Sequence, residues 1–255
     1  MNLKSHLDFA QSFVRESRKL VLELWQDDLG MELKQDSSPV TKLDRAIELR
    51  FREEAARHFP KHAVLGEEFG LSGGEQEFIW VIDPIDGTQS LVNRLPTFGT
   101  FLALLHRGEP VLGIVDIPVL GRSVAGAVGE GVVDELGRSV DLSSRRPYTP
   151  NDIVAIGTSG SFARKNQQPL QAALQSAFPT CRAYYDCFGH YLVGTGGVGA
   201  LVEMNVPLWD VVAIEAIVRA AGGEVIVVSG NSDDLFAYRS SICGRRGVVE
   251  EVQKI

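Results

Sequence analysis

An apolar run that ends in two carboxylates around a proline limits the folds open to this chain. The string WVIDPIDGT occupies residues 80–88. Residues 78–82 are apolar enough for a buried strand, and Pro84 cannot donate to a sheet ladder, so we expect the strand to end at Asp83. The Gly-Thr pair then permits a sharp turn into a helix. Two acidic side chains at such a turn predict a polar site at the end of a strand.

Composition narrows the class of protein. The chain has 255 residues, of which 44% are hydrophobic, and a net charge of −8. No basic cluster is longer than a pair, as at 145–146 and 245–246, which disfavours nucleic acid and anionic membranes as partners. An anionic small molecule can bind this acidic protein only if the binding site itself carries positive charge. The three cysteines form no CxxC pair, and we expect them to be reduced thiols. We see no apolar signal peptide and no membrane-spanning segment, and we therefore expect a cytoplasmic protein.

Hydrophobic spacing predicts helices and strands in alternation. In the first half we expect helices over 3–25 and 41–59 and strands over 78–82, 100–105, 111–116 and 123–128. The polar segment 145–152 marks a boundary between halves 1–145 and 146–255, within one compact unit. In the second half we expect strands over 153–156, 181–185, 200–203 and 224–228, and helices over 167–177 and 209–221. The result is an α/β or α+β protein with layered sheets, whose topology stays open.

Asp83 and Asp86 predict a metal site. Two carboxylates at the end of a strand suit Mg²⁺, which prefers oxygen ligands. The amides of Gly87 and Thr88, at the start of a helix, would hold an anion. Carboxylates, metal and amides together provide what the hydrolysis of a phosphate ester needs, because the metal supplies positive charge and a nucleophilic hydroxide.

Three further places combine acids with special backbone: Glu67-Glu68, Asp210 at the start of a helix, and Thr41 with Asp44. Each motif has a plainer interpretation. The DPIDG string forms tight turns, two adjacent glutamates can be solvated, Asp210 can cap its helix, and Thr41 with Asp44 fits a capping box. We favour a site because all four motifs occur together.

Taken together, GEE, WVIDPIDGT and a distant WD before a helix ending in AGG resemble the inositol monophosphatase family. The resemblance runs from the first helix to about Val228. It implies a layered α/β/α/β/α sandwich, a homodimer, and a Mg²⁺-dependent phosphatase that acts on a small phosphate monoester with two or three Mg²⁺ ions per site.

The resemblance also assigns roles to residues. The metal ligands it implies are Glu67, Asp83, the carbonyl of Ile85, Asp86 and Asp210. Glu68 would sit beside the metals, Thr88 with Asp44 would orient and deprotonate the attacking water, and the amides of Gly87 and Thr88 would hold the phosphate. Six carboxylates in one place would repel a phosphate unless divalent cations neutralise them.

The second half suggests the substrate. Asp186 and Glu203 would favour a cationic substrate, and the run DCFGH resembles the histidinol-phosphate phosphatase branch, an enzyme of histidine biosynthesis. We expect His190 to be a packed helix residue rather than a catalyst. The alternatives are an inositol-1-phosphatase or broad sugar-phosphate phosphatase and, in another class, a regulatory binding protein. The polar segment 34–41 is the lid we expect.

Overall fold

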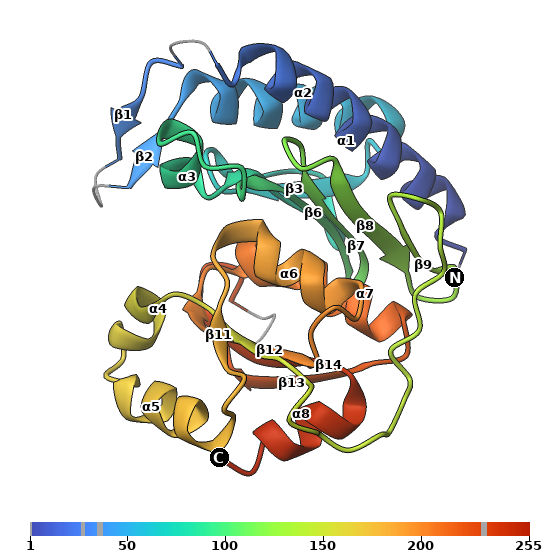
Figure 1. Ribbon diagram of the computed structural model, residues 1–255. Coiled ribbons are helices and arrows are strands. Elements are labelled where there is room, and N and C mark those ends of the chain that lie inside the picture. The colour runs from blue at the N-terminus through green and yellow to red at the C-terminus, as the bar shows by residue number, and fades with distance from the viewer. Residues whose placement is uncertain (1, 27–28, 35–37, 231–233) are drawn as a thin grey trace.

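Helices and sheets alternate in five layers, as the computed structural model shows (Figure 1). It describes residues 2–26, 29–34, 38–230 and 234–255. This confirms the α/β/α/β/α sandwich. Among the helices of these residues, none is both long enough and apolar enough to cross a membrane.

The first helical layer packs on the larger sheet. It consists of α1 (Lys4–Leu24) and α2 (Lys42–His58). The sheet has seven strands in the order β4-β3-β5-β6-β7-β8-β9, and only β3 and β5 pair in parallel. Its strands are β3 (His62–Gly66), β4 (Gly70–Gly73), β5 (Glu75–Asp86), β6 (Gly99–His106), β7 (Glu109–Ile117), β8 (Arg122–Ala127) and β9 (Gly131–Asp134). The short hairpin β1 (Glu32–Leu33) and β2 (Pro39–Val40) and helix α3 (Thr88–Val92) lie near one end of this sheet (Figure 1).

The second half supplies the other three layers. Helices α6 (Asp186–Gly194) and α7 (Leu208–Ala220) lie between the two sheets. The second sheet has the order β11-β10-β12-β14-β13. Its strands are β10 (Val154–Ile156), β11 (Arg182–Ala183), β12 (Ala200–Val206), β13 (Glu224–Ser229) and β14 (Arg239–Gly244). Helices α4 (Ser159–Ala163), α5 (Gln168–Ala177) and α8 (Arg246–Val252) cover its outer face.

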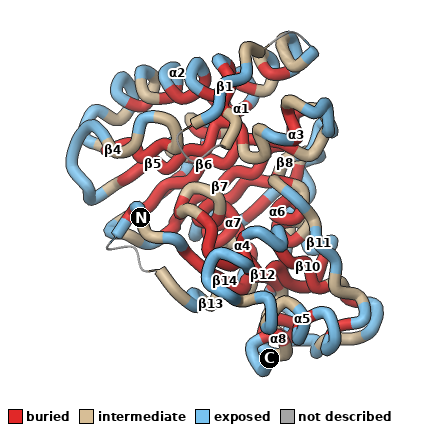
Figure 2. Tube along the Cα trace, turned by 90° about the vertical axis from the view of Figure 1, so that its left-hand side faces the viewer, coloured by how far each residue is buried: buried red, intermediate tan, exposed pale blue. Residues whose placement is uncertain are grey.

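Helix α7 is buried on nearly every side, because it is sandwiched between the sheets (Figure 2). Its buried residues include Val211, Ile214 and Ile217, which belong to the same apolar cluster as strand residues of both sheets. A helix that is apolar all round has no solvent face to turn outward. The position of its first turn, which carries Asp210, is therefore fixed from two sides.

Several sequence predictions needed correction or completion. The strand expected to end at Asp83 continues to Asp86, so that expectation was wrong. The sequence analysis also assigned no element to β14 or to α8. Of the expected lid, residues 35–37 lie outside the described residues.

A buried ion pair fixes α7 against β14. Arg239 binds Glu215 through two hydrogen bonds of 2.8 and 2.7 Å, and the two side chains are 5% and 0% exposed. We predict that Glu215→Ala lowers the free energy of unfolding by about 3–5 kcal/mol, because Arg239 is then left charged and buried. Urea unfolding followed by circular dichroism measures this. The exposed pair Lys4–Asp8 provides the control, and Asp8→Ala should cost about 1 kcal/mol or less. Equal losses for the two variants would contradict the prediction.

Candidate metal centre and active site

A bulge in β5 brings Asp83 and Asp86 together. Asp83 pairs with Phe101 and Asp86 with Gly99, so two residues of β5 oppose the single Thr100 of β6. In a regular strand, side chains three positions apart point to opposite faces, and the extra residue of the bulge changes this. Thr100 Oγ1 donates to the carbonyl of Pro84 at 2.8 Å, which holds the bulge. The proline therefore shifts the register of the strand without ending it.

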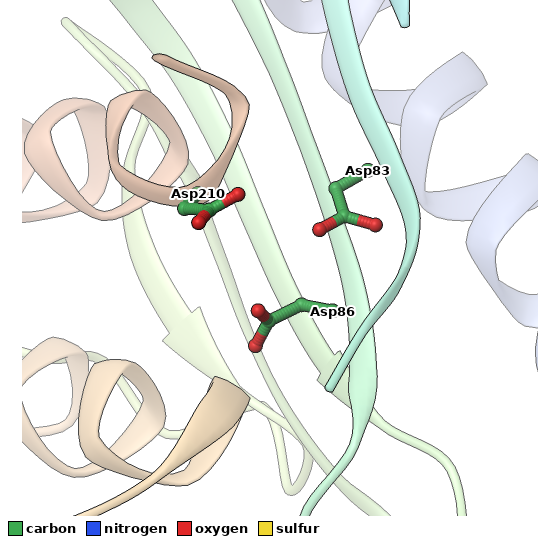
Figure 3. A group of neighbouring side chains, drawn as sticks. All are labelled: Asp83, Asp86 and Asp210. Carbon is green, nitrogen blue, oxygen red and sulfur yellow. The ribbon is translucent and has the colours of Figure 1, made fainter. Parts of the chain in front are cut away.

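Asp210 completes the cluster from the opposite side. One carboxylate oxygen from each of Asp83, Asp86 and Asp210 lies within 4.8 Å of the others, and the three side chains point toward one another (Figure 3). The N-cap of α7 is Pro207, and no side chain caps this helix. The interpretation of Asp210 as an N-cap was therefore wrong, and its carboxylate is left for the cluster.

The electrostatics of the cluster call for a cation. Burial raises the pKa of all three carboxyls well above the ordinary value, and the charges of the neighbouring acids raise it further. Asp86 Oδ2 is buried and has no hydrogen-bond partner among the described residues. Buried carboxylates without partners are stable as anions only when a positive charge neutralises them.

Glu67, with a side-chain exposure of 25%, lies within electrostatic reach of this cluster, and Glu68 is buried beside it. Glu68 has a side-chain exposure of 5%, and the Lys34 ammonium binds Glu67 Oε1 at 2.6 Å and Glu68 Oε1 at 2.7 Å. The charge of Glu67 raises the pKa of Asp83 and Asp210. Burial raises the pKa of Glu68 to about 7, although its hydrogen bond with Lys34 opposes this. The interpretation as a solvated pair was wrong.

The sequence analysis missed Glu48, which holds the Glu67-Glu68 loop in place. Its buried carboxylate accepts the amide of Glu68 at 2.8 Å and that of Phe69 at 3.2 Å. Arg52 binds the same carboxylate at 2.6 Å. The available signal was the spacing of four between Asp44, Glu48 and Arg52, which places three charged residues along one side of α2.

Asp44 has two functions at once. It closes the capping box of α2, in which its Oδ2 accepts the amide of Thr41 at 2.9 Å. Its other oxygen accepts a hydrogen bond from Thr88 Oγ1 at 3.0 Å. Thr88 Oγ1 also lies 3.1 Å from the carbonyl of Ile85. The capping box is therefore confirmed and the hydrogen bond between Asp44 and Thr88 is present, while the role of this pair in catalysis stays a prediction.

Asp186 joins the two halves beside the phosphate loop. Its Oδ2 accepts hydrogen bonds from Ser90 Oγ at 2.5 Å and from Thr97 Oγ1 at 2.9 Å. Gly87 has a φ of 81°, and a Cβ there would lie 2.5 Å from Asp186 Cγ, so this turn requires glycine. Asp186 thus lies against the loop that precedes α3, and the charge of Asp186 raises the pKa of Asp86.

Glu203 lies deeper, on β12. It is 6% exposed, and a Cβ on Gly157 would lie 2.3 Å from its Oε2, so the carboxyl packs on the end of β10. His190 Nε2 lies 3.7 Å from Glu203 Oε1. The charge of Glu203 raises the pKa of Asp210, which places Glu203 within electrostatic reach of that member of the cluster.

Known proteins resemble this chain over most of its length. The model of the inositol monophosphatase family matches residues 2–254. A histidinol-phosphatase of Mycobacterium tuberculosis is 33% identical over 210 residues, which are 80% of this chain and 79% of that protein. Human inositol monophosphatase 1 is 27% identical over 270 residues, covering 97% and 92% of the two chains. The solved structure of an IMPase from Thermotoga maritima superposes with a TM-score of 0.81 at 27% identity and covers 98% of this chain and 96% of that one.

The match of the family model, the phosphatase names of these relatives and the acidic cluster agree with one another. They make this chain a phosphomonoester hydrolase of a Mg²⁺-dependent family. The chain belongs to the inositol monophosphatase family.

Proposed function

We propose that this chain hydrolyses L-histidinol phosphate to L-histidinol and phosphate. The observation that carries the choice of substrate is the carboxylate of Asp186, which lies within electrostatic reach of Asp86 in the metal cluster. Glu203, near Asp210, adds a second negative charge where it is ionised. A substrate with an ammonium and an imidazole gains from such carboxylates, whereas a neutral polyol does not need them. Relatives named histidinol-phosphatase support this choice.

The donor set fits Mg²⁺. The residues that would hold the ions are Glu67, Asp83, Asp86 and Asp210, with the carbonyl of Ile85, and all of their donor atoms are oxygens. This is the ligand type that Mg²⁺ prefers. When bound, the metal supplies positive charge to the phosphate and lowers the pKa of a water. The unpartnered Asp86 Oδ2 is the atom that most needs such a charge.

The chain's own residues orient the water and receive its proton. Thr88 Oγ1 donates its hydrogen to Asp44 Oδ1. A lone pair of Thr88 Oγ1 is therefore free to accept a proton from the attacking water. Burial raises the pKa of Asp44, which makes this carboxylate a better proton acceptor than an exposed one. The amides of Gly87 and Thr88 precede the first closed turn of α3 and can donate to a phosphate oxygen. Glu68 lies beside Glu67 and adds negative charge to the metal side.

Inositol-1-phosphate is the second candidate substrate. Human inositol monophosphatase 1 matches over nearly the whole chain, and burial raises the pKa of Glu203 to about 8, so near pH 7 this carboxyl carries a proton and suits a hydroxyl. A homodimer stays a prediction from the family resemblance.

We predict that the two esters separate these functions. With saturating Mg²⁺, kcat/KM for L-histidinol phosphate should exceed that for inositol-1-phosphate. Asp186→Asn keeps an oxygen for Ser90 and Thr97 but removes the charge, and should reduce this ratio about tenfold, the effect of about 1.4 kcal/mol. Thr97→Val, which leaves the charge in place, is the matched control and should change the ratio less. A ratio below one in the wild type, or a ratio unaffected by Asp186→Asn, would refute the choice of substrate.

We further predict that Glu48 acts on metal affinity rather than on the chemical step. Glu48→Gln should raise the Mg²⁺ concentration for half-maximal phosphate release by about 10–100-fold, with kcat recovered at high Mg²⁺, because it weakens only the support of the Glu67-Glu68 loop. Asp210→Asn should lower kcat by about 100-fold or more even at high Mg²⁺. The exposed Glu53→Gln on the same helix is the control. An unchanged Mg²⁺ dependence in Glu48→Gln would rule out this role.

A further inference from the structure

His190 and Glu203 form a buried pair whose histidine has no role in the mechanism above. Their side chains are 6% and 8% exposed. The His190 ring packs edge-on against Phe101 with a centroid distance of 4.8 Å. Its Nε2 is buried and has no hydrogen-bond partner among the described residues, yet it lies 3.7 Å from Glu203 Oε1. A buried ring nitrogen without a partner is costly and calls for an explanation.

The other ring nitrogen fixes the tautomer. His190 Nδ1 lies 3.2 Å from the backbone carbonyl of Asp186. A carbonyl only accepts hydrogen bonds, so Nδ1 carries the proton. Burial lowers the pKa of His190 to about 4, which leaves the ring neutral near pH 7. Nε2 therefore presents a lone pair, and not a proton, to Glu203.

Nothing around Glu203 favours its charged form. Burial raises its pKa to about 8. The other titratable groups that interact with it are Asp210 on α7 and Cys243 on β14, and its charge raises the pKa of both. From β10 it meets the backbone of Gly157. No hydrogen bond from a described residue reaches its oxygens. A proton on Glu203 Oε1 would face the lone pair of His190 Nε2, which lies 3.7 Å away.

We propose that His190 sets the charge of Glu203, and through it the charge of the substrate end that this pocket accepts. The inference rests on the proposed function, because it concerns the same substrate pocket. A shift of about 1 Å brings the O–H of Glu203 into a hydrogen bond with His190 Nε2. Glu203 is then held as a neutral acid, and its second oxygen is free to accept from the substrate.

A cationic substrate must displace this proton. Two acceptors are available, the solvent and His190. Near pH 7, loss to the solvent opposes binding only about tenfold, because the pKa of Glu203 is about 8. Transfer to His190 is the less favourable route, because burial lowers the pKa of this ring to about 4. The proton therefore leaves Glu203 for the solvent while His190 stays neutral, and a cationic substrate gains as the pH rises through the ionisation of Glu203.

The test compares kcat/KM for L-histidinol phosphate and inositol-1-phosphate as a ratio, from about pH 6 to about pH 9.5, with saturating Mg²⁺. Ionisations of the enzyme that both reactions require cancel in the ratio. Ionisations of the two substrates affect the wild type and every variant equally, so they do not change the comparison between variants. In the wild type the ratio should rise with pH as Glu203 ionises, and the midpoint of this rise is the reference for the variants. In Glu203→Gln, which has no proton to lose, this rise should disappear.

The variant His190→Gln tests the direction in which the midpoint moves. Its amide N–H can donate to Glu203 and stabilise the carboxylate, so the midpoint should fall by about one pH unit. His190→Phe keeps a ring against Phe101 but removes the acceptor without adding a donor, so its midpoint should fall less than that of His190→Gln. A His190→Gln profile that superimposes on the wild type, or a rise that persists in Glu203→Gln, would overturn the proposal.

A second readout does not depend on the substrate. In ¹⁵N-histidine-labelled protein near pH 7, with the His190 signals assigned by their loss in His190→Gln, Nδ1 should be protonated and Nε2 should not. A protonated Nε2 would overturn the proposal even if both esters react. If neither ester is hydrolysed while the expected tautomer is present, the proposed substrate fails and the pairing of His190 with Glu203 stands.

Discussion

Mutual repulsion among buried carboxylates is the interaction on which the rest of this structure depends. Asp83, Asp86 and Asp210 would separate if the chain were free to relax, since burial and neighbouring charge both disfavour their ionised forms. The fold opposes that separation from two directions. The bulge in β5 fixes two of the acids on the larger sheet, and helix α7, buried between the sheets, fixes the third. The metal and its phosphate thus meet a site whose shape is set before they arrive.

The sequence predicted local features well and distant pairings poorly. Helices α1, α2 and α7 were found from apolar spacing, and the pair Asp83 and Asp86 from one short string, because both signals lie within a few residues. Asp210 was joined to that pair only through the family resemblance. Strand β14 was missed because its first three residues, Arg239, Ser240 and Ser241, are polar in sequence although they are buried in the structure. Glu48 was missed because its importance comes from amides of another segment, and Pro84 was misjudged because a bulge tolerates a residue that a regular ladder excludes.

The candidate site residues are not divided cleanly between the two halves of the chain. The larger sheet presents the phosphate loop, and the second half supplies Asp210 and the candidate substrate residues. Asp186 crosses this division, because its carboxylate accepts hydrogen bonds from Ser90 and Thr97 of the first half. The position of Asp186 is therefore coupled to the segment that carries Ser90 and Thr97, next to the turn at Gly87.

Asp44 connects chemistry to architecture in another way. The same carboxylate starts helix α2 and accepts the hydrogen bond of Thr88. A lineage that drifted toward a purely scaffolding role could not discard this acid freely, because its loss would also unravel the first turn of a helix that covers the core. Selection for stability alone would keep it. The persistence of this aspartate in a relative is therefore weak evidence of catalysis, and the loss of Thr88, which caps nothing, is the earlier sign that an enzyme of this kind has become a binding protein.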